Sequence, residues 1–120
     1  GTNDPSAYLT LPDIIKFLND YDWINVSKKC REINIQAKEL VANSLNKKPI
    51  STNEFIGQMT SFEINCKYPI DLMKTFYEKY KLAVPIFQWE DKVLLRFSIQ
   101  AYNSIEDIQK LIEVMKKLKL

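Results

Sequence analysis

The sequence predicts an α+β fold, in which a small antiparallel sheet of about three strands carries helices packed on one face. Three observations lead to this prediction. Apolar residues recur three or four positions apart in several segments, which is typical of amphipathic helices. Other segments alternate apolar and polar residues, as half-buried strands do. The 120 residues, 46% of them hydrophobic, are enough for one compact core and too few for two.

The first half of the chain is predicted to be mostly helical. After a polar turn over residues 1–6, a short helix is expected over residues 11–21, with Thr10 as its cap. A longer helix is expected over residues 26–45, because a narrow apolar stripe repeats there at helical spacing. This stripe comprises Val26, Cys30, Ile33, Ala37, Leu40, Ser44 and Leu45. Pro49 and its polar neighbours end the helix, since proline disfavours helical geometry in the residue before it.

The next two elements are a strand and a helix. Residues 59–66 alternate, with Phe62, Ile64 and Cys66 on one face and polar residues on the other, which predicts a half-buried strand. Proline favours the first turn of a helix, so the apolar residues between Pro69 and Tyr80 are expected to lie on one.

A hairpin and a final helix complete the predicted fold. Two strands, residues 86–89 and 92–99, are separated by a two-residue turn. On the second strand the apolar residues share one face, so Leu94, Arg96 and Ser98 point to the other face. A capping box formed by Ser104 and Asp107 begins the last amphipathic helix.

Composition excludes several classes of function. Seventeen basic and fifteen acidic residues give a formal charge of only +2, too little to predict nucleic-acid binding. The chain has no histidine, so it lacks the commonest general base and zinc ligand. Its two glycines cannot form a glycine-rich phosphate loop. No run of about 20 apolar residues and no signal peptide is present, which predicts a soluble, cytoplasmic protein without a membrane partner.

Two cysteines and one arginine remain as candidates for a functional role. Cys30 and Cys66 fall in apolar patterns and are expected to be buried free thiols, not a disulfide or a metal site. Arg96 is the candidate binding residue, because a guanidinium on a strand is rigidly aimed and can grip a carboxylate through two parallel hydrogen bonds. On pattern alone, a solvated arginine on an exposed strand face is the favoured explanation, because such faces usually carry charges without a special purpose.

Segments at both ends of the chain resemble one enzyme family. The sequence from Pro85 to Trp89, followed by that from Leu95 to Asn103 and a capped helix, resembles the C-terminal end of class V aminotransferases, in particular the isopenicillin N epimerase-like branch. The opening residues 1–9 resemble the glycine-threonine-x-aspartate-x-serine-alanine-tyrosine segment of that branch, and Gly57 to Thr60 resemble the lead into its C-terminal strand. The resemblance is to the part of the family that comprises the isopenicillin N epimerase-like and cysteine desulfurase-like enzymes.

This resemblance implies a fold-type-I pyridoxal-phosphate enzyme, normally a homodimer, with a large cofactor-binding domain followed by a small C-terminal domain. Residues 1–22 would be the tail end of the large domain, and residues 23–120 would be the small α+β domain. The partners it implies are an amino-acid substrate and the rest of the protein's own large domain.

The resemblance also implies roles for two residues. Arg96 matches the arginine that binds the substrate α-carboxylate, and Thr2 matches the threonine that binds the cofactor phosphate. Gln100 and Asn103 also match the family pattern but are expected to stabilise a turn first. No lysine, including Lys16 and Lys28, lies in a Schiff-base motif, so no catalytic residue is assigned and the chain is not expected to be active alone.

Two questions stay open at this point. The reaction could be epimerisation, transamination or elimination of sulfur or selenium, although neither cysteine has the exposed, electropositive setting of a desulfurase nucleophile. The alternative function is a free-standing α+β module that binds a protein or an anion, with Trp89 at the hairpin as an anchor.

Overall fold

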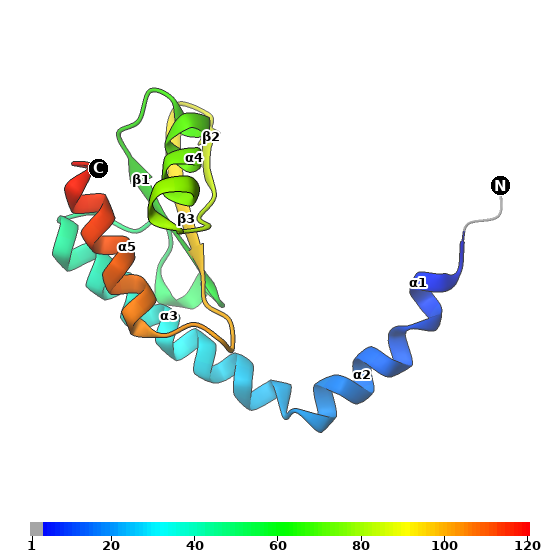
Figure 1. Cartoon of the computed structure of the whole chain (residues 1–120). Coiled ribbons are helices and arrows are strands. Elements are labelled where there is room, and N and C mark those ends of the chain that lie inside the picture. The colour runs from blue at the N-terminus through cyan, green and yellow to red at the C-terminus, as the bar shows by residue number, and fades with distance from the viewer. Residues whose placement is uncertain (1–3) are drawn as a thin grey trace.

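The computed structural model describes residues 4–120, so Thr2, the predicted phosphate-binding residue, lies outside the described part of the chain. Figure 1 shows a compact body of sheet and helices, from which the N-terminal helices project as an arm. The elements in chain order are α1 (Ser6–Leu9), α2 (Leu11–Asp20), α3 (Trp23–Leu45), the short 3-10 turn η1 (Asn53–Phe55), β1 (Met59–Ile64), α4 (Pro69–Tyr80), β2 (Ile86–Trp89), β3 (Lys92–Ser98) and α5 (Ile105–Lys117). The predicted α+β fold is therefore confirmed.

The sheet has three antiparallel strands in the order β1-β3-β2, so β3 is the central strand. The register pairs Trp89 with Lys92 across the predicted two-residue turn. Glu90, the first residue of that turn, has a positive φ of 51°, as the favoured two-residue hairpin turns require at this position. On the other side of β3, the register pairs Ser61 with Arg96. The predicted strands and their hairpin are confirmed to within a residue or two at their ends.

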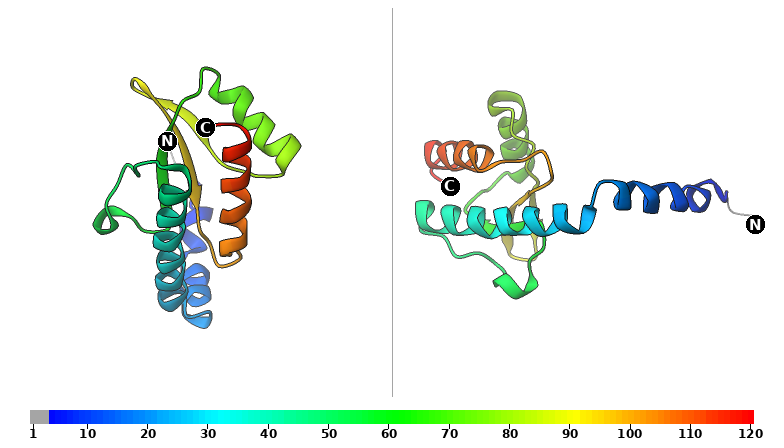
Figure 2. Two further views of the ribbon diagram at one scale, coloured as in Figure 1. Left: turned by 90° about the vertical axis from the view of Figure 1, so that its left-hand side faces the viewer. Right: turned by 90° about the horizontal axis from the view of Figure 1, so that it is seen from below.

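The core lies between one face of the sheet and helices α3, α4 and α5, and Figure 2 shows these helices around the sheet from two directions. Alternation along the strands supplies one half of this core and the apolar helix faces supply the other. The largest fully buried apolar side chains are Phe62, Phe76, Leu95, Ile99, Leu111, Met115 and Val41. Leu94, Arg96 and Ser98 lie on the opposite face, as predicted.

Helix α3 departs from the predicted apolar stripe. Cys30 and Ala37 are buried as expected, but Leu40 and Ser44 are exposed, and Val41 is buried in place of Leu40. Asn34 and Lys38 are buried although they are polar. The buried side of this 23-residue helix is therefore rotated relative to the predicted stripe. The reason is tertiary: β1 and the loop before it lie over Asn34 and Lys38 and form hydrogen bonds with them.

The N-terminal arm, defined as residues 4–22, differs from the prediction at its cap. Thr10 has helical backbone angles, and its hydroxyl donates to the carbonyl of Ala7 instead of capping α2. The reason is that α1, an additional helical turn, runs directly into α2, so no free helix end exists at Thr10. A left-handed residue, Asp22 with a φ of 48°, separates the arm from α3.

Candidate carboxylate-binding site

Arg96 lies in the middle of the central strand, which fixes the position of its backbone. Its amide N–H donates to the carbonyl oxygen of Pro85 at 2.9 Å, and Ser61 lies opposite it on β1. A strand that is paired on both sides cannot shift without breaking two ladders of hydrogen bonds. The sheet therefore aims this side chain with little freedom at the backbone.

The face of the sheet that carries Arg96 is exposed at its ends, while Leu94 at its centre is buried, and we call it the open face. Directly opposite residues in antiparallel strands project to the same side, so the register defines its members. They are Met59, Ser61, Glu63, Phe87, Trp89, Lys92, Leu94, Arg96 and Ser98. Trp89 is 60% exposed and Met59 is 52% exposed, so the described part of the chain does not cover the ends of this face.

The Arg96 side chain is half-buried and lacks a partner for one of its donors. Its guanidinium carbon lies 5.6 Å from the centre of the Phe87 ring, a cation–π distance that restrains the guanidinium plane. Its Nε is inaccessible to solvent and has no hydrogen-bond partner among the described residues. A buried donor without an acceptor costs about 1–3 kcal/mol, and after a rotation of the side chain that exposes Nε it would gain an acceptor from an anion bound side-on through Nε and one Nη.

The charge of Arg96 is also uncompensated on the open face. Lys92 and Glu63 form an ion pair at 3.3 Å on the same face and neutralise one another. Within residues 4–120, Arg96 forms no ion pair of its own. The open face therefore carries one surplus positive charge, which is half-buried and so attracts an anion more strongly than a fully solvated arginine would.

Polar residues at the end of β3 hold the strand-to-helix connection in place. The Gln58 side chain donates to the carbonyl of Ile99 at 2.8 Å and to the Gln100 side chain at 3.2 Å. Asn103 accepts a hydrogen bond from the Gln100 backbone N–H at 2.9 Å and donates to Asp107 at 3.2 Å. These contacts agree with the turn role predicted for Gln100 and Asn103.

The capping box that begins α5 is present, with Asp107 accepting from the Ser104 backbone N–H at 3.0 Å. A hydrogen bond from the Ser104 side chain lowers the pKa of Glu106 below its ordinary value. The start of α5 therefore depends on one serine and on two carboxylates in the first turn of the helix.

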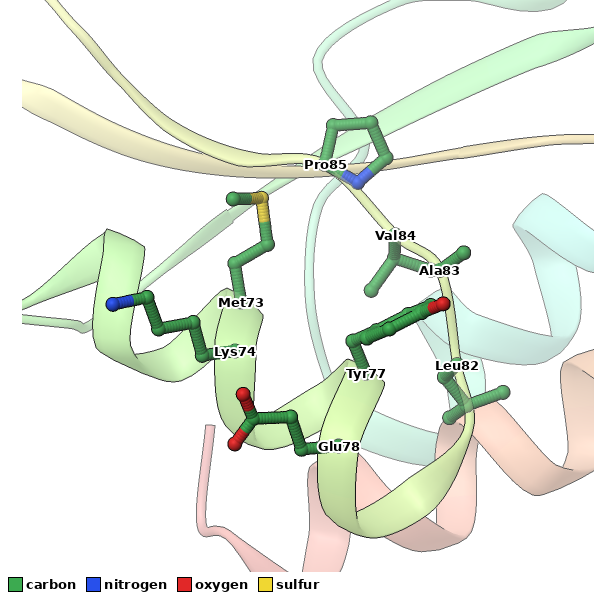
Figure 3. Close-up of a pocket in the computed structure, with 8 residues that line it drawn as sticks. All are labelled: Met73, Lys74, Tyr77, Glu78, Leu82, Ala83, Val84 and Pro85. Atoms are coloured by element: carbon green, nitrogen blue, oxygen red, sulfur yellow. The ribbon is translucent and has the colours of Figure 1, made fainter.

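The remaining residues considered from the sequence are not brought to Arg96. Lys16 lies on α2 and pairs with Asp20. Cys30 is buried and Cys66 is half-buried, and both are free thiols. Within the part of the chain that the structure describes, no cluster of three potential metal ligands was found, and no helix is long and apolar enough to cross a membrane. An apolar groove beside α4 (Figure 3) is lined by other residues and does not include Arg96.

Sequence reasoning missed two features of the site and its support. Phe87, which lies beside the guanidinium, follows from the hairpin register, because a two-residue turn at Glu90 and Asp91 already places Phe87 opposite Leu94. Asn34 supports β1 by accepting from Thr60 at 3.1 Å and donating to the carbonyl of Gly57 at 3.0 Å. Nothing in the helical periodicity indicated that contact.

Comparison with solved structures defines the class of fold. The structure is similar to that of 8-amino-7-oxononanoate synthase from Francisella tularensis, with a TM-score of 0.66 and 22% sequence identity. The match covers 85% of this chain and 30% of the other. The chain thus has an α+β fold like that of one part of a fold-type-I pyridoxal-phosphate enzyme.

Comparison with curated sequences then gives a particular relative. The chain is 25% identical over 121 aligned residues to isopenicillin N epimerase from Amycolatopsis lactamdurans. This alignment covers 98% of the chain but only 30% of the epimerase, so the chain spans less than a third of that relative's length. No family model matches the chain. The predicted resemblance to the epimerase-like branch of the class V aminotransferases is therefore confirmed.

Proposed function

We propose that this chain is the C-terminal part of a pyridoxal-phosphate-dependent enzyme that acts on an amino acid, and that Arg96 binds the substrate carboxylate. The observation that carries the proposal is the unpartnered Nε of Arg96 on the open face. A surplus positive charge and an unused donor in one rigid guanidinium match the two oxygens of a carboxylate. The similarity to the epimerase supports an amino-acid-like substrate.

In the whole enzyme, the described residues would position the substrate. A carboxylate held by both Nε and Nη of Arg96 cannot rotate freely, so the bond at the substrate α-carbon that is to break keeps one orientation. Phe87 restrains the guanidinium plane, and the Glu63–Lys92 pair removes a competing carboxylate from Arg96. Bound pyridoxal phosphate supplies the electron sink that makes cleavage at this carbon possible.

The cofactor would be held by the large domain, of which residues 1–22 are the proposed end. In this proposal Thr2 contacts its phosphate, and the lysine that binds its aldehyde belongs to the large domain. Among the described residues, the unpartnered guanidinium donor suits the substrate carboxylate, and the three grooves found do not include Arg96.

The arm supports the proposed division into residues 1–22 as the end of a large domain and residues 23–120 as a small domain. Large apolar side chains on the arm are exposed. They are Tyr8, Leu9, Leu11, Ile14, Ile15, Phe17, Leu18 and Tyr21. Such a surface is expected to be covered by further protein. In the proposed whole enzyme, a cytoplasmic homodimer, the large domain provides that cover.

Among the reactions considered, we favour epimerisation or transamination. The curated relative is an epimerase, and the buried Cys30 and half-buried Cys66 lack the exposure of a desulfurase nucleophile. A free-standing binding module is the less supported alternative. It gives no reason for the similarity of nearly the whole chain to part of an epimerase.

The test is Arg96→Ala in the full-length protein. We expect the KM for the amino acid to rise about 100-fold, since charge-assisted paired hydrogen bonds contribute about 1.5–3 kcal/mol. Cofactor binding, followed by the visible absorbance of the bound cofactor, should stay unchanged. Arg96→Lys should recover part of the loss, because lysine keeps the charge but not the paired geometry.

Lys110→Ala is the control, because it removes one positive charge from an exposed position on α5, away from the open face. It should change the KM by no more than about twofold, since exposed charges far from a site are screened by salt. A KM for Arg96→Ala equal to that of the wild type would exclude the proposed role. Loss of the cofactor signal in that variant would instead indicate a structural role.

A further inference from the structure

Helix α4 presents an exposed apolar strip on the side of the molecule opposite the open face. Phe76 on its inner side is fully buried in the core, whereas Ile70 and Tyr77 are 63% and 65% exposed. Met73 and Tyr77 extend toward the segment 82–85, and together they form a surface groove of about 470 Å³ (Figure 3). Lys74 and Glu78 also line this groove, from the outer side of the helix (Figure 3).

Four charged side chains follow the same outer side of α4. Asp71, Lys74, Glu78 and Lys81 are all exposed and alternate in sign at spacings of three, four and three residues. Such spacings keep Asp71, Lys74 and Glu78 along one side of the helix, and Lys81 follows as its left-handed C-cap residue. None of the four takes part in the ion pairs found among residues 4–120. Lys74 four residues before Glu78 is the less favourable order within a helix, so internal stabilisation does not explain this central pair, whereas Asp71 three residues before Lys74 has the favourable order.

The charge pattern along α4 is complementary to that of a second copy of α4 in antiparallel orientation. Read from Asp71 to Lys81 the signs are negative, positive, negative, positive, and read backwards every sign is inverted. Two copies of α4 side by side in antiparallel orientation therefore bring opposite charges together at all four positions. In parallel orientation, like charges would meet and the contact would be repelled.

We propose that α4 is a self-association surface, on which a second copy of this chain docks its own α4 in antiparallel orientation about a twofold axis. The axis passes at the level of Phe76. It brings Lys74 opposite Glu78 of the second copy, and Asp71 opposite Lys81 of the second copy. In this orientation Ile70 of one copy lies toward the C-terminal end of the other α4, where segment 82–85 forms one side of the groove, so the apolar strip of one copy reaches the groove of the other. This is the isologous contact that a twofold symmetry requires.

The contact is small and separate from the proposed active site. Three exposed apolar side chains on one helix provide much less than the roughly 800 Å² per partner of a stable interface, so association is expected to be weak. Arg96 lies on the other face of the sheet, so α4 pairing leaves it free. The inference does not depend on the proposed function, and in a full-length dimer it would join one dimer to another.

The test uses two single charge reversals, K74E and E78K. Each variant alone places like charges opposite one another twice, and we expect about tenfold weaker self-association in sedimentation velocity over a concentration series. In an equimolar mixture, positions 74 and 78 are both negative in the K74E chain and both positive in the E78K chain. A mixed pair therefore brings opposite charges together at both contacts, and the mixture should associate at least as well as the wild type.

Reversals at another exposed pair with the same spacing are the matched control. Lys28 and Glu32 lie exposed on α3, and K28E and E32K should associate like the wild type. Circular dichroism checks that every variant keeps its helical content. The proposal is overturned if K74E and E78K associate like the wild type, or if both are weakened and their mixture does not recover. The latter result would mean that the apolar arm or some other surface makes the contact.

Discussion

Asn34 and Arg96 are two polar side chains whose hydrogen bonds have opposite meanings. Asn34 is fully buried, and its amide is satisfied by Gly57 and Thr60, so it joins α3 to β1. Arg96 is only half-buried, yet one of its donors has no acceptor in the described part of the chain. A satisfied buried group supports the fold, and an unsatisfied one indicates a missing partner. In the proposed function, the substrate carboxylate supplies the acceptor that Arg96 lacks.

Replacing Asn34 by alanine should destabilise the domain by about 2–3 kcal/mol. The change removes two buried hydrogen bonds and leaves the Thr60 hydroxyl without a partner. Adding Thr60→Val to that variant removes the stranded hydroxyl and should recover about 1 kcal/mol. Urea unfolding measures the free energies. Asn43→Ala, an exposed position on the same helix, is the control and should stay within about 0.5 kcal/mol of the wild type. An equally small effect at Asn34 would contradict the assignment.

Among the elements, α5 has the most clearly defined N-terminus, because its capping box follows directly from sequence. Ser104→Ala should destabilise the domain by about 1 kcal/mol, the usual contribution of a serine cap. The effect should depend on pH, since the Ser104 hydroxyl also holds the pKa of Glu106 below its ordinary value of 4.5.

The sign of that dependence follows from linkage. A carboxylate with a lowered pKa in the folded state stabilises the fold above its ordinary pKa, and this contribution is lost as the pH falls through the folded-state pKa. The wild type should therefore exceed the Ser104→Ala variant by more at pH 7 than at acid pH, as measured by thermal unfolding. Glu106→Gln should remove this part of the pH dependence. A difference that grows on acidification would rule out the hydrogen bond to the carboxylate.

Local patterns predicted the elements well and their contacts less well. Alternation along β1 and β3 gave the strand faces correctly, because a period of two has only two sides to choose between. The buried side of α3 was wrong at Leu40 and Ser44, since the loop residues Asn53 and Gly57 draw polar side chains of α3 inward through hydrogen bonds. Sequence placed Arg96 on the correct face, but its contact with Phe87 and its orphaned Nε depend on side-chain geometry across strands.

For the whole molecule, the division between arm and body has the largest consequences. No residue from 4 to 29 is buried, and the first buried residue along the described chain is Cys30. The arm therefore contributes little apolar burial to the domain core, while its own apolar side chains stay exposed. Helical periodicity identified the apolar side of α2 but could not indicate what covers it, because the covering surface is not encoded within the helix.

Removal of residues 1–22 should leave the body folded, with a loss of stability of about 1 kcal/mol or less. The reason is that the core formed by the sheet with α3, α4 and α5 begins at Cys30, and the arm contacts mainly the start of α3 through Phe17 and Trp23. Loss of Asp22 takes away a side-chain acceptor for Asn25 and should only fray the first turn. Thermal unfolding and amide NMR spectra of residues 23–120 would measure this. Removing exposed apolar residues should also reduce nonspecific association.

The same arm should behave differently in the full-length enzyme. There its amides should exchange hydrogen slowly, because the large domain covers them in the proposed arrangement. Hydrogen exchange read by mass spectrometry on both proteins makes the comparison. An unfolded 23–120 chain would show that the arm belongs to the domain core, and rapid exchange of the arm in the full-length protein would show that it is not a packed part of the large domain.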